Sequence, residues 1–329
     1  MDVLQGIKKN TFVVVGRVGI DFSPEPAGVG IEDATSMMVA MGGSSANIAA
    51  GLVKFGSKAA LVTRVSNDAI GRYCISQLNR YGVDATHVKP ISGEFRNSLA
   101  VYETRVENHN SVIYRNGAAD FQMCIEDVEA VDYTQFGALI TAGTVFAAEP
   151  SRSAAFRAFE LAKAAGLPVI FDVDYRPYSW PSPQVAEEVL SKAGAMADVI
   201  VANDEEFGFM AGGLEKGLAK ARALAATTAA IVVYKMGHLG AITFADGTET
   251  QSGIYPVQAV KPTGAGDSFM AGFIASLAEG RDLNNAVMWG SACAAIVVAK
   301  PGCAPAMPTE DQLEAFLGSH PGPSVPDVI

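Results

Sequence analysis

A glycine-rich turn followed by an aspartate carries the strongest chemical signal in the sequence, TGAGDSF at residues 263–269. Apolar residues at helical spacing follow it, so Gly264, Ala265 and Gly266 lie at the start of a predicted helix. Their backbone N–H groups and the helix dipole form a site for an anion, such as the charge on a phosphoryl group in transfer. Asp267 lies beside this site and could accept the proton of an attacking hydroxyl. The alternative is a tight turn in which Asp267 only complements the charge of the helix end.

Two further segments carry groups suited to a ligand with several hydroxyls. In GGSSANIA (residues 42–49), Gly43 permits a ligand to approach the backbone, and Asn47 can donate to and accept from hydroxyl groups. Asp21 follows the first strand at its carboxyl end, where ligands bind in open α/β sheets, and could bind two vicinal hydroxyls. A helix-start turn with a satisfied Asn47, and a solvated or capping Asp21, remain as alternatives.

Turns after two later strands carry groups suited to a metal–phosphate complex. Asn203 and Glu206, in NDEE, could hold the water shell of Mg²⁺ and a phosphate oxygen, although a helix N-cap with acidic residues fits equally well. In KMGHLG (residues 235–240), Lys235 offers a point charge for a phosphate and Gly237 permits close approach. A simple β-turn is the alternative there.

Two arginines point to an acidic ligand. Arg115 lies in YRNGAAD and Arg176 in DVDYRPYSW, after a buried strand. Guanidinium groups bind planar anions in a bidentate manner, so both favour a substrate with a carboxylate. Arg176 could equally pair with Asp172 or Asp174 in a structural network.

A regular alternation of short apolar strands with helices positions these residues. The predicted strands are residues 11–16, 59–65, 138–141, 168–174, 198–203 and 229–237. The predicted helices are residues 44–55, 70–81, 151–165, 185–193 and 214–226. Alternation with short connections predicts an α/β fold, a doubly wound and mostly parallel sheet flanked by helices.

Two segments depart from this alternation and predict a second, smaller sheet. Residues 31–41 and 98–115 resemble half-exposed strands, which need covering by a ligand site or by another subunit. We predict an α/β core of residues 1–20, 42–92 and 118–329, with a β lid of residues 21–41 and 93–117. The lid strands are candidates for a homodimer contact.

Composition excludes several function classes. The formal net charge of −11, without a long run of one sign, argues against a nucleic-acid partner. No apolar segment approaches the ~20 residues of a membrane span, and the cysteines form no C-x-x-C pair, so we expect a cytoplasmic protein without a membrane partner. The absence of G-x-x-x-x-G-K-[ST], G-x-G-x-x-G and G-x-S-x-G motifs disfavours Walker-type NTPases, dinucleotide-dependent oxidoreductases and hydrolases.

Residues 42–84 and 261–273 resemble the N-terminal and C-terminal signatures of the ribokinase-like (phosphofructokinase-B type) carbohydrate kinase superfamily. The resemblance covers nearly the whole chain. It implies ATP and Mg²⁺ as cofactors, Asp267 as the catalytic base and residues 264–266 as the anion hole. It implies sugar contacts from Asp21, Gly43 and Asn47. It also implies nucleotide contacts from Asn203, Glu206 (near Mg²⁺, through water), Lys235, Gly237, Gly240, Thr263 and Gly266, with the adenine along residues 285–302.

Several stretches resemble the kinases of inositol breakdown that phosphorylate 5-dehydro-2-deoxy-D-gluconate, among them residues 114–120, 149–152, 172–180 and 301–309. The resemblance implies ATP-dependent phosphorylation of a primary hydroxyl of a keto-sugar acid. Its carboxylate agrees with the argument from the two arginines. The rivals are a 2-dehydro-3-deoxygluconate kinase and a fructokinase-like sugar kinase. A non-catalytic sugar or nucleotide sensor is more remote, because a sensor would not need Asp267.

One position departs from the superfamily pattern. Ribokinase has an acidic residue two places before the position of Thr263, where it helps to hold a monovalent cation, whereas this chain has Lys261. An ammonium group cannot coordinate potassium. We therefore expect no conventional monovalent-cation site, with Lys261 in its place.

Overall fold

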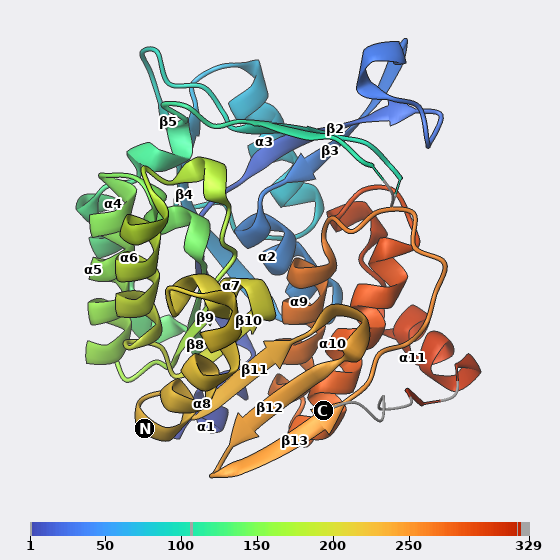
Figure 1. Ribbon diagram of the computed structural model, residues 1–329. Coiled ribbons are helices and arrows are strands. Elements are labelled where there is room, and N and C mark those ends of the chain that lie inside the picture. Colours follow the sequence, from blue (N-terminus) through green and yellow to red (C-terminus); the bar gives the residue numbers. More distant parts are fainter. Residues whose placement is uncertain (1, 106–107, 321, 324–329) are drawn as a thin grey trace.

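The computed structural model describes residues 2–105, 108–320 and 322–323. Within them, a nine-stranded sheet has the order β13-β12-β11-β10-β9-β8-β1-β4-β5 (Figure 1). Its strands are β1 Thr11–Val15, β4 Lys58–Ser66, β5 Val88–Ile91, β8 Ala138–Ala142, β9 Val169–Asp172, β10 Val199–Asn203, β11 Ile231–Lys235, β12 Ala241–Ala245 and β13 Thr248–Ser252. Pairing is parallel from β11 to β5, while β12 and β13 add an antiparallel edge. The predicted mostly parallel, doubly wound sheet is confirmed.

Helices cover both faces of this sheet because its strands are apolar on both sides. Along β1, Phe12 and Val14 face one core cluster, and Val13 and Val15 face the other. The first cluster includes residues of α1 Val3–Ile7, α2 Ser44–Lys54, α3 Ala69–Arg80, α9 Ala265–Ala278, α10 Leu283–Val298 and α11 Glu310–Ser319. The second includes residues of α4 Ile125–Glu129, α5 Ser151–Ala164, α6 Pro183–Gly194, α7 Asp204–Met210 and α8 Gly217–Thr227.

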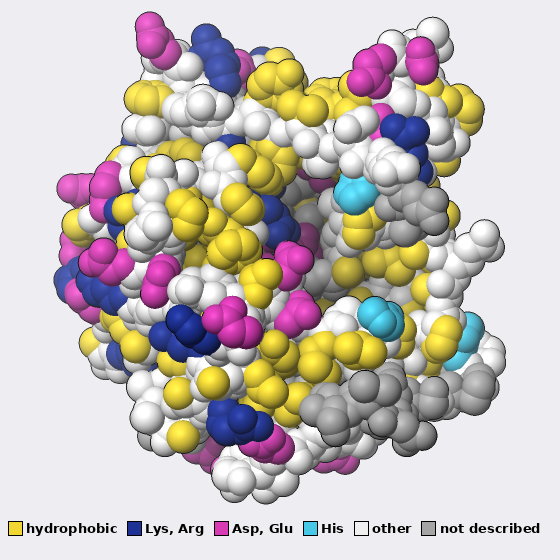
Figure 2. Space-filling model, viewed as in Figure 1, with side chains coloured by type: hydrophobic (Ala, Val, Ile, Leu, Met, Phe, Trp, Pro, Cys, Tyr) yellow, Lys and Arg dark blue, Asp and Glu magenta, His cyan; other side chains and the backbone are white. Residues whose placement is uncertain are grey.

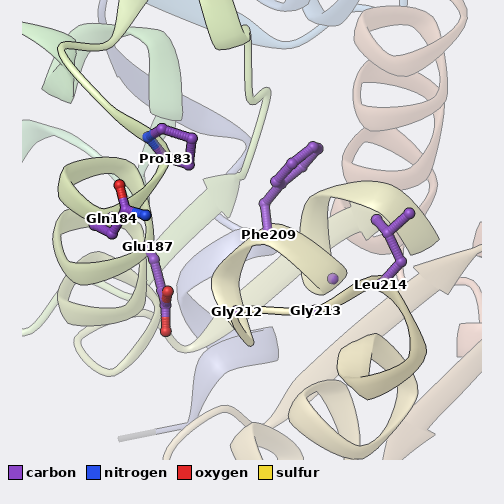
Figure 3. Close-up of a pocket in the computed structure, with 8 residues that line it drawn as sticks. Pro183, Gln184, Glu187, Phe209, Gly212, Gly213 and Leu214 are labelled. Atoms are coloured by element: carbon purple, nitrogen blue, oxygen red, sulfur yellow. The ribbon is translucent and has the colours of Figure 1, made fainter.

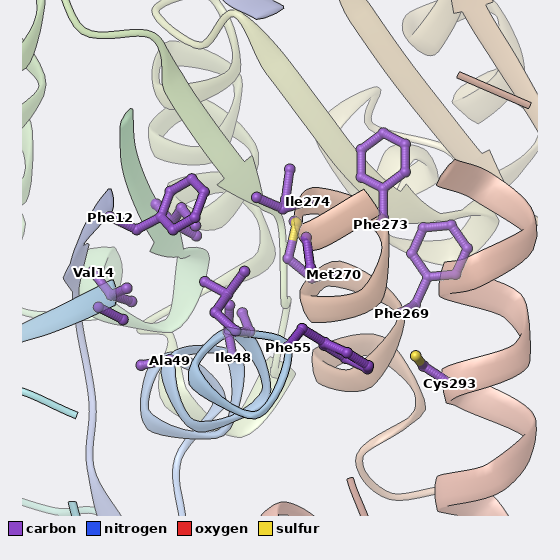
Figure 4. Close-up of a cluster of buried hydrophobic side chains, with 14 of the residues drawn as sticks. Phe12, Val14, Ile48, Ala49, Phe55, Phe269, Met270, Phe273, Ile274 and Cys293 are labelled. Atoms are coloured by element: carbon purple, nitrogen blue, oxygen red, sulfur yellow. The ribbon is translucent and has the colours of Figure 1, made fainter. Parts of the chain in front are cut away.

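Close packing fixes α2 against α9, the two helices that carry Asn47 and Asp267. A Cβ added at Gly51 of α2 would lie 2.5 Å from the Cβ of Ala271 of α9. Figure 4 shows the apolar cluster formed by β1, α2, α9 and α10, in which Phe273 is fully buried. Because a packed core transmits small displacements, the relative position of Asn47 and Asp267 depends on this contact.

A separate four-stranded sheet, the lid, has the order β3-β2-β6-β7 and lies beyond the carboxyl end of β1 (Figure 1). Its strands are β2 Gly19–Glu25, β3 Ser36–Gly42, β6 Leu99–Tyr102 and β7 Ser111–Tyr114. The prediction of a strand from residue 31 was wrong at its start, because Ile31–Asp33 form a short 3₁₀ helix. Strand β2 was not predicted: Asp21, which the sequence placed directly after the first strand, lies within this lid strand.

Strand β2 escaped prediction because it contains a glycine and a proline. Its parallel pairing with β6 involves only Ile20, Asp21 and Phe22, so Pro24 lies beyond that ladder and costs it no hydrogen bond. Among the other unpredicted strands, β5 is only four residues long and β13 is highly exposed, and each lies at one edge of the main sheet. Strand β12 is mostly buried and lies between β13 and β11. Among the described helices, none is long and apolar enough to cross a membrane.

Candidate active site

The glycine-rich turn forms the start of α9, as its sequence predicts. Gly264 is the N-cap residue with φ of 87°, in the left-handed region that favours glycine. An added Cβ there would also lie 2.7 Å from the Sγ atom of Cys303. The N–H of Ser268 donates to the Gly264 carbonyl at 3.1 Å and opens the helical ladder. The N–H groups of Ala265, Gly266 and Asp267 precede it and have no partner within the helix.

Asp267 lies in this first turn and is held by Asn47 of α2. The Nδ2 atom of Asn47 donates to Oδ2 of Asp267 at 2.7 Å, across 220 positions of sequence. Burial away from water raises the pKa of Asp267, and the Asp174 carboxylate raises it further. The hydrogen bond from Asn47 and the charges of Arg176 and Arg17 lower this pKa, but by less. The structure therefore brings together two predicted site residues and places a carboxylate with increased basicity beside unpaired amides.

A second carboxylate, Asp174, lies in the loop after β9. It accepts from Ser44 Oγ at 2.5 Å and pairs with Arg176 at 2.7 Å. Its φ of 37° is unusual for a residue with a side chain, and these two contacts hold it there. Although burial alone would raise its pKa, Arg176 and Ser44, with smaller contributions from Arg17 and Arg115, keep that pKa below its ordinary value. Of the two structural partners that the sequence left open for Arg176, Asp172 and Asp174, the structure shows Asp174.

Asp21 is buried in the lid strand β2 and faces the backbone of the double glycine. A Cβ added at Gly42 would lie 1.9 Å from the Oδ1 atom of Asp21, so only glycine fits opposite this carboxylate. Burial raises the pKa of Asp21 to about 6, against lowering by Arg17, while Asp267 raises it further. Gly43, next in the chain, is the N-cap of α2 with φ of 98°. The structure places Asp21, Gly43 and Asn47 around one corner of the site.

Asn203 and Glu206 form a capping box at the start of α7. The backbone N–H of each residue donates to the side chain of the other at 2.8 Å. This helix N-cap is the structural alternative that the sequence left open. Glu206 also accepts from the N–H of Tyr175 at 3.2 Å and lies 3.9 Å from Arg176. Its pKa is raised by burial, in spite of nearby Lys235 and Arg176.

Lys235, the last residue of β11, reaches the start of α9. Its Nζ atom lies 3.7 Å from the position that a Cβ of Gly266 would occupy, and apart from the neighbouring residues and the backbone of the same helix no other atom lies within 4 Å of that position. The ammonium group and the unpaired first-turn amides thus border one open space, which suits a phosphate. Gly237 has φ of 56° and open space around it. At Gly240 a Cβ would lie 1.9 Å from the Ser252 carbonyl, so this glycine is needed for backbone packing.

Lys261 lies behind the same turn and is fully buried. Its ammonium group donates to the backbone carbonyl of Thr263. Burial lowers its pKa, and the neighbouring Cys303, Asp267 and Asp21 oppose that shift. A positive charge is thus fixed between the turn and two carboxylates of the site.

Arg115 lines a pocket of about 350 Å³ together with Tyr178 and Glu149. Its Nε and Nη2 atoms donate to Asp120 at 2.9 and 2.5 Å, and Nη1 donates to the Thr144 carbonyl at 2.9 Å. The guanidinium also stacks on the Phe121 ring. The structure therefore places Arg115 beside a pocket with three of its donors in use.

A second pocket of about 260 Å³ lies apart from these carboxylates, between α6 and the end of α7 (Figure 3). In the space-filling view the surface is hollowed between the lid and the main body, with side chains of both charges in and around the hollow (Figure 2). Sequence reasoning missed Arg17, whose positive charge lowers the pKa values of Asp21, Asp174 and Asp267. Its signal was its place directly after the first buried strand.

The fold and this arrangement of a carboxylate beside helix amides define a carbohydrate kinase of the ribokinase-like fold. The chain belongs to the pfkB family of carbohydrate kinases: the sequence model of this family matches residues 9–310. The resemblance read from the signatures is therefore confirmed.

Curated relatives cover almost the whole chain. A Geobacillus thermodenitrificans protein named 5-dehydro-2-deoxygluconokinase is 36% identical over 311 residues, which is 93% of this chain and 92% of the relative. A protein of the same name from Photobacterium profundum is 34% identical, with 93% and 94% of the two chains covered.

Solved structures share the fold. A fructokinase double mutant from Vibrio cholerae O395, in its fructose-, ADP- and potassium-bound form, has a TM-score of 0.81 and 25% identity, with 93% of this chain and 98% of that chain covered. A fructokinase from Xylella fastidiosa with bound ATP has a TM-score of 0.82 and 19% identity, with 94% and 98% covered.

Replacing Asp21 by Asn should stabilise the protein increasingly as pH rises from about 4 to 7. Because its pKa in the folded protein is raised to about 6, ionised Asp21 destabilises the fold as pH rises through that value, and Asn carries no such charge. The gain approaches about 3 kcal/mol, the equivalent of about two pKa units. Thermal melts of both proteins over this pH range measure it.

The control for this prediction is Asp132→Asn. The side chains of Thr134 and Gln135 lower the pKa of Asp132, so this variant should lose stability at neutral pH. A difference between Asp21→Asn and the natural protein that does not change with pH would contradict the prediction.

Proposed function

We propose that this kinase transfers the γ-phosphoryl group of ATP to a primary hydroxyl of a keto-sugar acid, 5-dehydro-2-deoxy-D-gluconate. The observation that carries the phosphoryl transfer is the Asp267 carboxylate, held by Asn47 at 2.7 Å beside the unpaired amides of α9. The substrate is supported by the two relatives of that name and by the arginines around the site. Among the alternatives, a 2-dehydro-3-deoxygluconate kinase and a fructokinase differ only in the substrate.

In this proposal the hydroxyl oxygen attacks the γ-phosphorus, the bond to the β-phosphate oxygen of ADP breaks, and Asp267 takes the hydroxyl proton. Asn47 orients the carboxylate, and the raised pKa of Asp267 makes it a better proton acceptor. The amides of residues 264–266 stabilise charge on the phosphoryl group, with Lys235 opposite them. Asp21, Gly43 and Asn47 hold the sugar, and the lid excludes water that would otherwise hydrolyse ATP.

The charges present also fit Mg²⁺ at the phosphates. Mg²⁺ keeps several waters and takes oxygen ligands, so one protein carboxylate with phosphate oxygens is enough, and we propose Glu206 for that role through water. When bound, the ion neutralises charge on the phosphates. The buried Glu206 is fixed by two backbone N–H groups, from Asn203 and Tyr175, which orient it without neutralising it.

The lid also offers a contact for a second subunit. Val39, Val112 and Tyr114 are large apolar side chains that are 45%, 42% and 61% exposed on its strands. We propose a homodimer formed through this face, because exposed lid strands are commonly covered by a partner. A single-chain mass by light scattering at micromolar concentration would refute it.

The test of the proposed function is ADP release with Mg·ATP and a panel of acceptors: 5-dehydro-2-deoxygluconate, 2-dehydro-3-deoxygluconate, fructose, ribose and adenosine. We expect the highest kcat/KM for the first, because the site combines hydroxyl-binding groups with arginines. A preference for 2-dehydro-3-deoxygluconate would keep the sugar acid and change its identity. A preference for fructose would overturn the substrate assignment, and no sugar-dependent turnover would favour the sensor.

Replacing Asp267 by Asn should lower kcat by about 10²- to 10⁴-fold, because the variant retains the hydrogen-bonding shape but cannot accept the proton. Binding of Mg·ATP, measured by calorimetry, should change little. Asp311→Asn, on the exposed surface of α11, is the matched control and should keep full turnover. Equal kcat in Asp267→Asn and the natural protein would remove the base from Asp267.

We propose that Lys261 makes turnover independent of monovalent cations, since its buried ammonium group already binds the Thr263 carbonyl. Exchanging potassium for sodium should change kcat less than about twofold, which corresponds to a much smaller free-energy difference than a tenfold change in rate. Lys261→Ala should lose turnover, and added ammonium or methylammonium should restore part of it, whereas tetramethylammonium is too large. Strong potassium activation of the natural protein would contradict this proposal.

A further inference from the structure

Three arginines surround the acidic site, and two of them have carboxylate partners. Arg115 pairs with Asp120 and Arg176 with Asp174. Arg17 forms no ion pair with any residue that the structure describes. Its Nη1 atom donates to Ser98 Oγ at a long 3.3 Å, and its Nε atom is buried without any acceptor. A buried donor without an acceptor is costly, so this one needs an explanation.

The backbone at Arg17 is fixed at the junction of the main sheet and the lid. Its carbonyl accepts from the N–H of Ala46, in the first turn of α2, at 3.2 Å. The same carbonyl packs so tightly on Gly43 that an added Cβ would lie 2.6 Å from it. Asn47, which holds Asp267, follows Ala46 directly. The Arg17 side chain therefore starts from a rigid position beside the proposed sugar contacts.

The charge of Arg17 acts on the whole acidic site. It lowers the pKa values of Asp21, Asp174 and Asp267, whereas burial raises the pKa of each of these three carboxyl groups. A substrate with a carboxylate would enter a space bordered by these three carboxylates. It would be repelled unless a cation with unused donors met it, because opposite charge and hydrogen bonding must offset the loss of water.

Arg115 and Arg176 are poorly suited to be that cation. Turning either guanidinium toward a ligand would leave Asp120 or Asp174 as an unpaired buried charge, a change that typically costs several kcal/mol. Arg176 also donates from Nη1 to the Tyr175 carbonyl at 3.0 Å. These two arginines hold the acidic loops in place and add positive charge, while Arg17 has a buried Nε donor without an acceptor and no carboxylate that its movement would leave unpaired.

We infer that Arg17 binds the carboxylate of the sugar acid in a bidentate manner, through Nε and a terminal guanidinium nitrogen. This inference rests on the proposed function and names the residue that selects acids over neutral sugars. The planar fork of an arginine matches a carboxylate, which a lysine at this position would meet only as a point charge.

The experiment compares binding of gluconate and glucitol, a sugar acid and its neutral alcohol, by calorimetry in the natural protein, Arg17→Gln and Arg17→Lys. Arg17→Gln should weaken gluconate binding by about 10- to 100-fold, the range for a hydrogen-bonded charge, and glucitol binding by less than about twofold. Arg17→Lys should fall between. Arg72→Gln, the same change at an exposed site on α3, is the matched control and should bind both ligands as the natural protein does.

Turnover gives an independent readout. With 5-dehydro-2-deoxygluconate, Arg17→Gln should raise KM more than it lowers kcat, while the KM for fructose should stay unchanged. Equal losses for gluconate and glucitol, or unchanged gluconate binding in Arg17→Gln, would overturn the role of Arg17. Failure of the natural protein to phosphorylate any sugar acid in the panel would instead overturn the proposed function, because the gluconate experiment does not depend on turnover.

Discussion

The contact between α2 and α9 is the constraint on which the rest of the site depends. Gly51 lets the two helices approach closely, and one turn of α2 earlier Asn47 donates to Asp267. Hydrogen-bond geometry is strict, so a shift of about 1 Å between the helices would break this bond. The buried apolar cluster in Figure 4 therefore has a chemical consequence, because it sets where the proposed base lies relative to the amides of α9.

Around that fixed pair the protein balances an unusual concentration of buried charge. Asp21, Asp174, Glu206 and Asp267 lie in reach of one another's fields, and their pKa values respond differently. Asp174, with Arg176 and Ser44 as partners, has a lowered pKa, whereas the other three have raised values. A carboxylate with a raised pKa is a better proton acceptor but destabilises the fold at neutral pH. The buried carboxylates with raised pKa values thus lower the stability of the fold at neutral pH, and the Asp21→Asn variant measures that loss for one of them.

The sequence predicted the regular elements better than the irregular ones, for physical reasons. Buried parallel strands such as β1 and β10 are continuous apolar runs, and the α9 turn has a glycine pattern that few other structures need. Strand β2, with Pro24, has no such pattern. Side-chain partners were harder still: the hydrogen bonds of Ser44 with Asp174 and of Asn47 with Asp267, and the missing acceptor for Arg17 Nε, depend on contacts between segments distant in sequence. Local patterns contain no information about those contacts.

The segment from Val15 to Asp21 connects the two sheets and the two halves of the proposed chemistry. It leaves the main sheet at β1, turns through Arg17 and enters the lid as β2, so seven residues carry both the proposed carboxylate-binding group and a proposed hydroxyl-binding group. Because Arg17 is tied to α2 through its carbonyl and to Ser98 before β6 through its side chain, it bridges core and lid. A substrate carboxylate bound to Arg17 would satisfy the buried Nε and add a contact at that bridge. Acid recognition and lid position are then one event, which a neutral sugar would not produce.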